Sequence, residues 1–395
     1  MKARDVVVID GIRTAFGRAG EKGYFWRTRA DDMVVKVIRT LLHRNPKVKP
    51  EMVEENVWGA FTQEGDQGLT LGRSTVILSG LPVSCAGFSV DRLCAGGLTA
   101  VTTAASEIAL GACDIAIAGG VEHMGHHPIL SNAEPNPRFL TERLVSEDGL
   151  SMGMTAENLH DMYPEITRET ADRYALLSQT KTARAYKEGK IQKMITPMTV
   201  YTGEGWVVAD RDEQPRPDTT MEGLAKLKAP FRAEGKVTPG NSSGLNDGAA
   251  GVLLMSADKA AEIGGVPRMR LKGYAYLGVR PEIMGYGPVP ATRKALEKTG
   301  LTMNDVGAIE LNEAFAVQCV VFMKEMGLKL LDDERLNKLG GAIAFGHPLA
   351  ASGVRLVIHL LNIFSESPHI RYGMTTLCVG LGQGATAIWE NVNAD

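Results

Sequence analysis

The chain has 395 residues, 44% of them hydrophobic, which is enough for two or three domains or one large duplicated body. Its 43 basic and 46 acidic residues nearly cancel and form no block of like charge, which excludes electrostatic binding of nucleic acid or an anionic membrane. The five cysteines form no closely spaced pairs and no apolar run approaches the roughly 20 residues that span a bilayer, so we expect a cytoplasmic globular protein without a disulfide framework.

Short apolar runs alternate with amphipathic segments along the first third of the chain. Strands are predicted over 6–9, 56–60 and 114–118, and helices over 31–43, 72–78 and 98–110. The run over 6–9 is too short and too soon interrupted for a signal peptide. This alternation predicts an α/β fold.

The middle of the chain, from about 122 to 247, has a different composition. Prolines, methionines and charged residues are denser there, strand patterns are scarce, and a long helix is predicted over 167–188. Long connections in compact proteins usually serve a function. We therefore expect an inserted domain that covers a site, although an insertion used only for oligomer contacts would have the same pattern.

The last third repeats the order of the first. Gly346-His347-Pro348 precedes a helix predicted over 353–364, which is followed by strands over 375–378 and 385–389. Cys94 likewise precedes a helix and then a strand. This shared order suggests an internal duplication whose two turns face each other.

Two cysteines and one histidine lie at these glycine-rich turns. Cys94 precedes helix amides that can lower the pKa of a thiol, and Cys378 comes just before Gly380-Leu381-Gly382-Gln383-Gly384. Together with His347 they form a candidate nucleophile, acid and base. A lone cysteine in such a turn is more often a packed small residue, so the hypothesis depends on all three residues.

Two other patterns have simpler explanations. The glycines at 380–384 could belong to a dinucleotide-binding loop, but the chain ends before the helix, strand and acidic residue which that motif requires. His123, His126 and His127 have no cysteine or carboxylate at a spacing useful for a metal site. We expect neither a bound dinucleotide nor a metal.

Four further motifs accompany Cys94 along the chain. They are Met284-Gly285-Tyr286-Gly287-Pro288-Val289-Pro290, Asn312-Glu313-Ala314-Phe315, Gly340-Gly341-Ala342-Ile343-Ala344-Phe345-Gly346-His347-Pro348 and Cys378-Val379-Gly380-Leu381-Gly382-Gln383-Gly384. In this order they resemble the thiolases, the family of 3-ketoacyl-CoA thiolases and acyl-CoA C-acetyltransferases, over the whole chain. The segment 121–126 further resembles the thiolase subunit of the bacterial fatty-acid β-oxidation complex.

The resemblance implies a fold and a division of the chain. In the thiolase fold, two βαβαβαββ halves form a five-layered αβαβα body with an inserted loop domain. The implied parts are an N-terminal half (1–121), a loop domain with the coenzyme A site and oligomer contacts (122–247), a return to the N-terminal half (248–270) and a C-terminal half (271–395).

The implied reaction is the cleavage of a 3-ketoacyl-CoA by coenzyme A to acetyl-CoA and a shortened acyl-CoA, or the reverse Claisen condensation. By this resemblance Cys94 attacks and carries the acyl group, His347 removes its proton, and Cys378 is the acid and base. The amides of Cys94 and Gly380 stabilise the oxyanion, and Asn312 holds a water that polarises the thioester oxygen. Coenzyme A is a substrate, and no permanent cofactor is implied.

Six positions match the family's motifs for coenzyme A binding: Met152, Arg216, Lys228, Phe231, Ser243 and Phe315. Ser243 is expected to contact the pantetheine arm, Met152 and Phe231 to line the tunnel, and Arg216 to approach the adenine or phosphate end. Lys228 stands where relatives often have arginine, and its ammonium lacks the planar fork of a guanidinium. Solvated charges and plain core residues would have the same sequence pattern.

Three positions depart from the family pattern. Gly96 replaces a usual serine, Leu339 a usual asparagine and Ala350 a usual glycine. None of them carries a reacting atom, but Ala350 adds a methyl group that the backbone must tolerate. We expect activity to survive with an altered substrate fit.

Other functions would share most of these residues. A biosynthetic acetoacetyl-CoA thiolase uses the same site, a ketoacyl synthase-like enzyme uses a single cysteine, and an inactive scaffold only binds acyl-CoA or a partner subunit. The resemblance implies a homodimer or homotetramer, alone or with a hydratase/dehydrogenase subunit, that acts in fatty-acid degradation in the cytoplasm.

Overall fold

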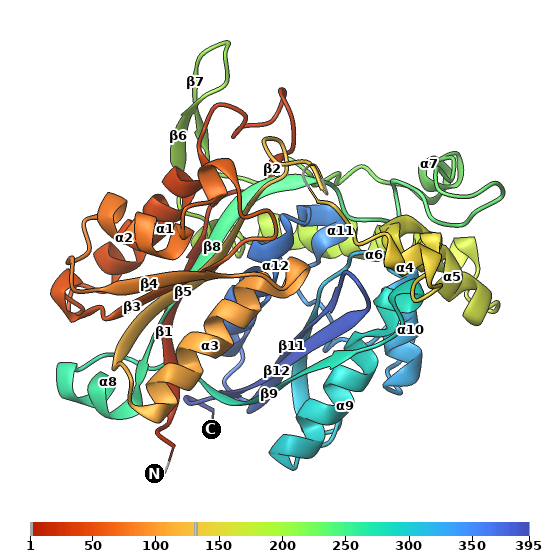
Figure 1. Ribbon diagram of the computed structural model, residues 1–395. Coiled ribbons are helices and arrows are strands. Elements are labelled where there is room, and N and C mark those ends of the chain that lie inside the picture. The colour runs from red at the N-terminus through yellow and green to blue at the C-terminus, as the bar shows by residue number, and fades with distance from the viewer. Residues whose placement is uncertain (1–2, 130, 132, 395) are drawn as a thin grey trace.

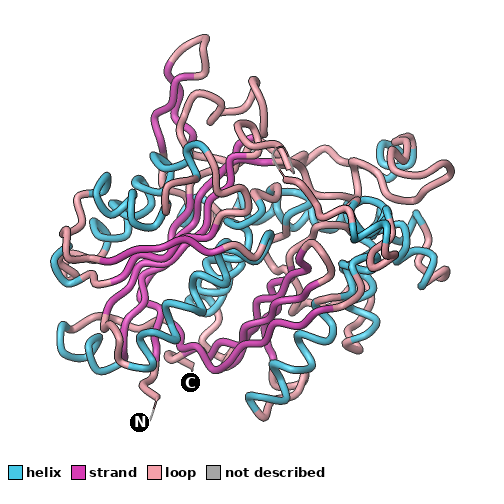
Figure 2. Tube along the Cα trace, in the orientation of Figure 1, coloured by secondary structure: helices cyan, strands magenta, loops and turns pink. Residues whose placement is uncertain are grey.

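The computed structural model describes residues 3–129, 131 and 133–394, so the outer ends of the two expected halves, Met1, Lys2 and Asp395, lie outside the described residues. A ten-stranded mixed sheet has the order β10-β11-β12-β9-β1-β8-β5-β3-β4, with β2 paired to β8. Helices lie between and outside its two halves (Figures 1 and 2). This arrangement agrees with the expected α/β fold of two halves packed together.

Most strands in the N-terminal half of the sheet are almost wholly buried, whereas the edge strand over 86–90 is partly exposed. The strands of this half are β1 (Val6–Arg13), β2 (Gly17–Arg18), β3 (Glu55–Gly59), β4 (Ala86–Val90), β5 (Ile115–His123) and β8 (Asn246–Ser256). β3 is parallel to β4 and β5, whereas β8 is antiparallel to β5 and β1. Helices α1 (Ala30–Arg44) and α2 (Leu71–Ser79) pack on this half, together with the turns η1 (Pro50–Met52) and η2 (Gly65–Gln67) and helix α8 (Ala257–Ile263). Strands covered on both faces are apolar along their length.

The C-terminal half has fewer strands and joins the first through a short contact. It contains β9 (Met269–Gly278), β10 (Val306–Leu311), β11 (Tyr372–Val379) and β12 (Gln383–Asn391), with η6 (Pro281–Tyr286), α9 (Pro288–Thr299) and α10 (Ala316–Glu325). β1 pairs with β9 only through Val7–Arg270 and Val8–Met269. The halves are therefore joined mainly by packing rather than by the sheet.

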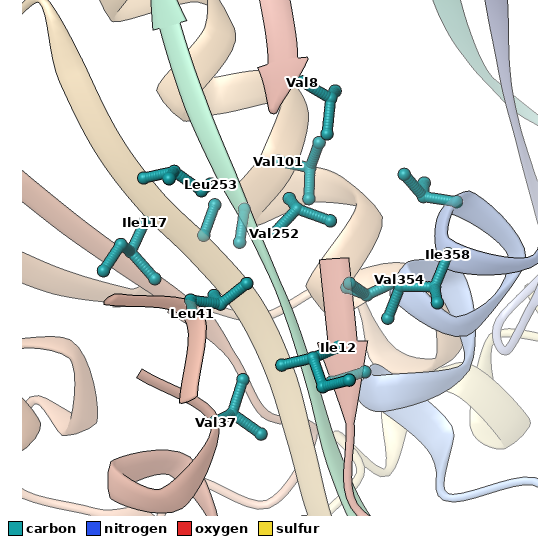
Figure 3. Packing of buried hydrophobic residues seen from close by; sticks show 14 of the residues in the cluster. Val8, Ile12, Val37, Leu41, Val101, Ile117, Val252, Leu253, Val354 and Ile358 are labelled. Carbon is teal, nitrogen blue, oxygen red and sulfur yellow. The ribbon is translucent and has the colours of Figure 1, made fainter. Parts of the chain in front are cut away.

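Two helices form the central layer, α3 (Gly96–Leu110) and α12 (Leu349–Glu366). Figure 3 shows Val101 of α3 and Val354 and Ile358 of α12 in the buried cluster with residues of β1 and β8. Windows over Leu93–Leu110 and Leu349–Glu366 are apolar and long enough to cross a membrane, contrary to expectation, but 61% and 83% of them are buried inside the protein. Their apolar character is accounted for by burial between the two halves of the sheet.

Most of the regular structure in the middle segment is helical, as predicted, and long loops join its helices. It contains α4 (Arg138–Thr141), η4 (Glu147–Leu150), α5 (Met152–Met162), α6 (Arg168–Lys187), η5 (Gln192–Met194) and α7 (Met221–Ala225). Thr167 caps α6 by accepting a hydrogen bond from the amide of Thr170. The hairpin of β6 (Met198–Tyr201) and β7 (Trp206–Ala209) was not predicted and projects from the body (Figure 1).

Candidate active site

Three turns that are distant in sequence meet beside the central helices. The turn η3 (Leu93–Ala95) carries Cys94 and packs against α12 and β11. His347 lies between α11 (Ala342–Phe345) and α12, and Cys378 lies near the end of β11. The structure thus brings together the three segments that were predicted to meet.

The backbone before Cys94 is strained. Leu93 has a φ of 47°, in the left-handed region that a branched side chain rarely adopts. Its amide donates a 2.7 Å hydrogen bond to the Asp91 carboxylate, which holds the turn. Such strain is maintained only where the surroundings determine it, and here it fixes the position of the thiol.

The pKa of Cys94 differs from the sequence-based prediction. Burial raises the pKa of this thiol to about 12, rather than helix amides lowering it. The backbone N–H of Gly380 donates to the sulfur and partly opposes this effect, whereas the nearby Glu122 adds to it. The resting nucleophile is therefore a neutral thiol that needs a base.

Cys378 is 1% exposed and lies one pair before the β11–β12 turn. The glycine-rich segment forms this turn, with Leu381 at a φ of 56°, and not a dinucleotide-binding loop. Burial raises the pKa of Cys378, and a charge on Cys94 raises it further. The Cys378 thiol donates to Oε1 of Gln318 at 3.8 Å, so it is held in its protonated form.

His347 is buried and held at three atoms. Its backbone N–H donates to Asn246 at 3.0 Å, Nδ1 is 2.6 Å from Oγ of Ser352, and Nε2 is 3.3 Å from Nδ2 of Asn312. Burial, and then the charge of Arg355, lowers the pKa of His347 to about 3. The imidazole is thus neutral in the resting site.

An apolar cavity of about 290 Å³ opens beside Cys94. Its lining includes Phe61, Leu93, Cys94, Ile129, Phe139, Leu150, Met152, Leu349, Gly380 and Leu381. The cavity joins the nucleophile, the Gly380 amide and one of the residues predicted for coenzyme A, Met152. It can hold an apolar group next to the sulfur.

The other residues predicted for coenzyme A fall into two groups. The Phe231 ring packs over Gly153, next to Met152, and Ser243 bonds through its backbone to Ala314, next to Phe315. Arg216 and Lys228 are exposed, and no described acidic side chain forms an ion pair with either. Arg216 lines a second cavity of about 250 Å³ rather than the one beside Cys94.

Carboxylates from segments distant in sequence approach the histidine cluster, although none stands at a useful spacing within the sequence itself. Asp66 is 3.0 Å from Nδ1 of His126 and pairs with His127, while Asp247 is 3.4 Å from Nδ1 of His123. His123 stacks on His126 with ring centroids 3.6 Å apart. These contacts satisfy the rings, and among the described residues no group of metal-ligating side chains could hold an ion.

Three residues that orient the site were not predicted from the sequence. Gln318 contacts Cys378, Ser352 contacts His347, and Arg355 contacts Asn312. Ser352 and Arg355 are three residues apart on α12, a spacing that places both on one helix face directly after His347. Two buried polar side chains at that spacing in an apolar helix were the available signal.

Comparisons with known proteins agree over the whole chain. A family model for the thiolase N-terminal domain matches residues 6–258, and one for the thiolase C-terminal domain matches 266–391. The chain is 44% identical to a 3-ketoacyl-CoA thiolase of Idiomarina loihiensis, over 98% of this chain and 100% of the relative, and 42% identical to one of Pseudoalteromonas translucida, over 98% of each. The crystal structure of Bacillus anthracis acetyl-CoA acetyltransferase superposes with a TM-score of 0.89 at 36% identity, over 99% of this chain and 100% of that one.

Proposed function

The chain belongs to the thiolase family, and we propose that it cleaves 3-ketoacyl-CoA with coenzyme A to give acetyl-CoA and an acyl-CoA shortened by two carbons. Coenzyme A and acyl-CoA are its substrates. The observation that carries the proposal is the Gly380 amide directed at the sulfur of Cys94, within electrostatic reach of a second thiol, Cys378. One thiol carries the acyl group and the other exchanges protons.

In the first half-reaction, His347 takes the Cys94 proton as the sulfur attacks the 3-keto carbon. The Gly380 amide stabilises the oxyanion. Its collapse breaks the bond between the α and β carbons and leaves the acyl group on Cys94. The electron pair of that bond becomes the acetyl-CoA enolate, which takes the Cys378 proton, while Asn312 helps to polarise the thioester oxygen.

In the second half-reaction, the Cys378 thiolate removes the proton of incoming coenzyme A. The coenzyme sulfur attacks the acyl thioester, and Cys94 leaves as a thiolate that recovers its proton from His347. A neutral His347 suits this exchange because it accepts a proton only as the thiol reacts. Run backwards, the same steps condense two acyl-CoA molecules.

The size and lining of the cavity favour an acyl chain longer than acetyl. The cavity beside Cys94 is about 290 Å³ and mostly apolar, and each methylene that it buries contributes about 0.8 kcal/mol. This supports degradative thiolysis over a function limited to acetoacetyl-CoA. The second thiol argues against a ketoacyl synthase and an inactive scaffold.

The finer features of the site and assembly belong to the same proposal. Met152 and Phe231 would line the pantetheine tunnel, Ser243 and Phe315 would contact the arm, and Arg216 and Lys228 in the loop domain (122–247) would approach the phosphates. The free cysteines suit the cytoplasm. A homodimer or homotetramer, alone or with a hydratase/dehydrogenase subunit, is the expected assembly.

Thiolysis of 3-ketoacyl-CoA substrates of graded length, followed at the enolate absorbance band, tests this function. Cys94→Ser should lower kcat by at least about 1000-fold, and Cys378→Ala by at least about 100-fold while leaving an acyl group on Cys94 that mass spectrometry detects. Cys113→Ala, which alters a buried thiol away from the site, should keep near wild-type activity. Full activity in Cys378→Ala would favour a synthase, and no turnover at any chain length would favour a scaffold.

A further inference from the structure

Helix α12 carries a buried cation whose hydrogen bond goes to the active site. The guanidinium of Arg355 is 0% exposed, and its Nη2 donates to Oδ1 of Asn312 at 3.0 Å. Its Nε and Nη1 have no hydrogen-bond partner among the described residues. A fully buried arginine that leaves donors unpaired lowers stability, so its single hydrogen bond calls for a functional explanation.

We infer that Arg355 is a positioning residue that turns the amide of Asn312 toward His347 and the substrate, an inference that rests on the proposed thiolase function. An amide has one oxygen and one nitrogen end. Because the Arg355 cation bonds the oxygen, Nδ2 of Asn312 faces Nε2 of His347 at 3.3 Å. If the Asn312 amide were reversed, its nitrogen would face the Arg355 cation and its oxygen would face the thioester oxygen of the substrate. Both contacts would be repulsive.

Glu310 and His359 lie beside Arg355 but form no hydrogen bond with it. Glu310 lies two residues before Asn312 and is 3.7 Å from Nη1 of Arg355, while Nδ1 of His359 is 3.2 Å from the same carboxylate oxygen. His359 follows Arg355 by four residues on α12. Arg355 and His359 share one face of α12. This face lies against Glu310 and Asn312 at the end of β10, so the arrangement depends on the packing of α12 against β10.

Helix α12 also orients His347, which faces the amide of Asn312. Ser352 of α12 contacts Nδ1 of His347 at 2.6 Å, three residues before Arg355. The first two turns of α12 therefore orient both the base and the amide that polarises the thioester. A shift of this helix would displace His347 and Asn312 together.

Arg355 also acts on His347 through its charge. The charged groups that bear on Arg355 come from several elements and are Glu310, Glu313, Arg13 and Asp212. For His347, after burial, Arg355 is the charge that opposes protonation. A neutral residue at 355 therefore favours the imidazolium and moves the acid limb of the kcat/KM profile to higher pH.

A double-mutant cycle between Arg355→Met and Asn312→Ala tests the inference. In the wild-type background, Arg355→Met should lower kcat by about 10- to 100-fold, with KM for coenzyme A changed less than about two-fold. In the Asn312→Ala background the same change should lower kcat by less than about two-fold, because the amide it orients is absent. Arg355→Lys, which keeps the charge without the fork, should lower kcat while keeping the pH profile closer to wild type.

Arg13→Lys is the matched control, since Arg13 is the other arginine among the largest fully buried side chains and pairs with Asp212 outside the site. It should lower the melting temperature but keep kcat within about two-fold. Equal losses from Arg355→Met in both backgrounds, or an unchanged kcat in an active enzyme, would overturn the inference. If Arg355→Met does not fold, the cycle is run with Arg355→Lys. A wild-type enzyme without thiolysis would instead overturn the proposed function.

Discussion

His347 is a neutral base in the folded protein because it is buried without an acidic partner. Its hydrogen-bond partners are the neutral side chains of Ser352 and Asn312, and the nearby charge, Arg355, is positive. A catalytic histidine paired with a carboxylate would have the opposite shift. The site therefore keeps both the base and the nucleophile uncharged until substrate is present.

This environment predicts the pH dependence of acylation. Protonation of His347 removes the base, and because burial lowers its pKa to about 3, the imidazole stays neutral as pH falls through the ordinary histidine range near 6.5. The kcat/KM for thiolysis should thus show no acid limb from this group between pH 5 and 8. Initial rates in buffers of constant ionic strength measure it, and a limb centred near 6.5 in the wild type would contradict the prediction.

Gln318 affects the second thiol. Its Oε1 accepts hydrogen bonds from Cys378 and from Cys319, each at 3.8 Å. Gln318→Leu keeps most of the volume but removes the acceptor that orients the acid, a hydrogen bond worth about 1–1.5 kcal/mol, so kcat should fall by about 10-fold. Alkylation of Cys94 by iodoacetamide should proceed at the wild-type rate.

Cys319→Ala is the control for that variant, because it removes the other thiol on the same oxygen. It should retain kcat within about two-fold. An equal loss of kcat in both variants would indicate a packing effect on α10, which carries both residues.

For the helices and strands, the sequence predicted the type of each segment more accurately than the residues at which it ends. The helix predicted over 98–110 is α3, Gly96–Leu110, and the strand predicted over 114–118 continues to His123. The extension includes the buried Glu122, whose carboxylate accepts from the amides of Phe61 and Thr62. Those partners come from a distant segment, so no local pattern indicates that a polar residue continues the strand.

The same reasoning separates the site residues that could be predicted from those that could not. Cys94, His347 and Cys378 stand at glycine-rich turns, a local signal that marks a position near the backbone of another segment. Gln318 and Arg355 act through contacts between α10, α12 and the strands, which depend on tertiary packing. Burial also reversed the expected pKa of Cys94, because the helix-amide argument omits desolvation.

Gly96 and Ala350, two residues that we expect to depart from the family pattern, lie next to each other where α3 begins. A Cβ atom at Gly96 would lie 3.1 Å from Cβ of Ala350, at the start of α12. Gly96→Ser alone should therefore crowd this contact, lower stability by about 1–3 kcal/mol and reduce kcat by displacing Cys94. Gly96→Ser with Ala350→Gly should recover most of both, as thermal unfolding and thiolysis rates can measure.

Gly97 provides the control for this pair. A Cβ atom there would lie 2.3 Å from the backbone oxygen of Ala350, which no side-chain change removes. Gly97→Ala should thus be destabilising whether or not Ala350→Gly is present. Rescue of Gly97→Ala by Ala350→Gly would show that α12 moves freely at this contact.

The whole molecule is a duplicated body in which each half contributes one central helix. α3 follows the turn of Cys94, α12 follows the turn of His347, and the two helices meet where Gly353 approaches Leu98. Because the central layer belongs to both halves, the site forms only when they are packed together. The loop segment must also be fixed to this body if it is to cover the site.

An ion pair connects that segment to β1. Asp212 accepts bonds of 2.6 and 2.8 Å from Arg13, and both side chains are 0% exposed. The carboxylate also accepts from the amide of Phe16 and the hydroxyl of Tyr186. Removing one partner of a buried pair leaves an uncompensated charge, which costs about 3–5 kcal/mol.

Asp212→Ala should therefore lower the free energy of unfolding by about 3–5 kcal/mol and expose the loop segment to limited proteolysis. Arg13→Met combined with Asp212→Leu removes both charges while keeping volume, so its loss of stability should be smaller than that of Asp212→Ala. Glu169→Ala breaks the exposed pair with Arg173 and should change stability by less than about 1 kcal/mol. Urea denaturation measures the stability of all three variants. If the double variant is less stable than Asp212→Ala, the ion pair itself, rather than the avoidance of a lone buried charge, holds the loop segment to the body.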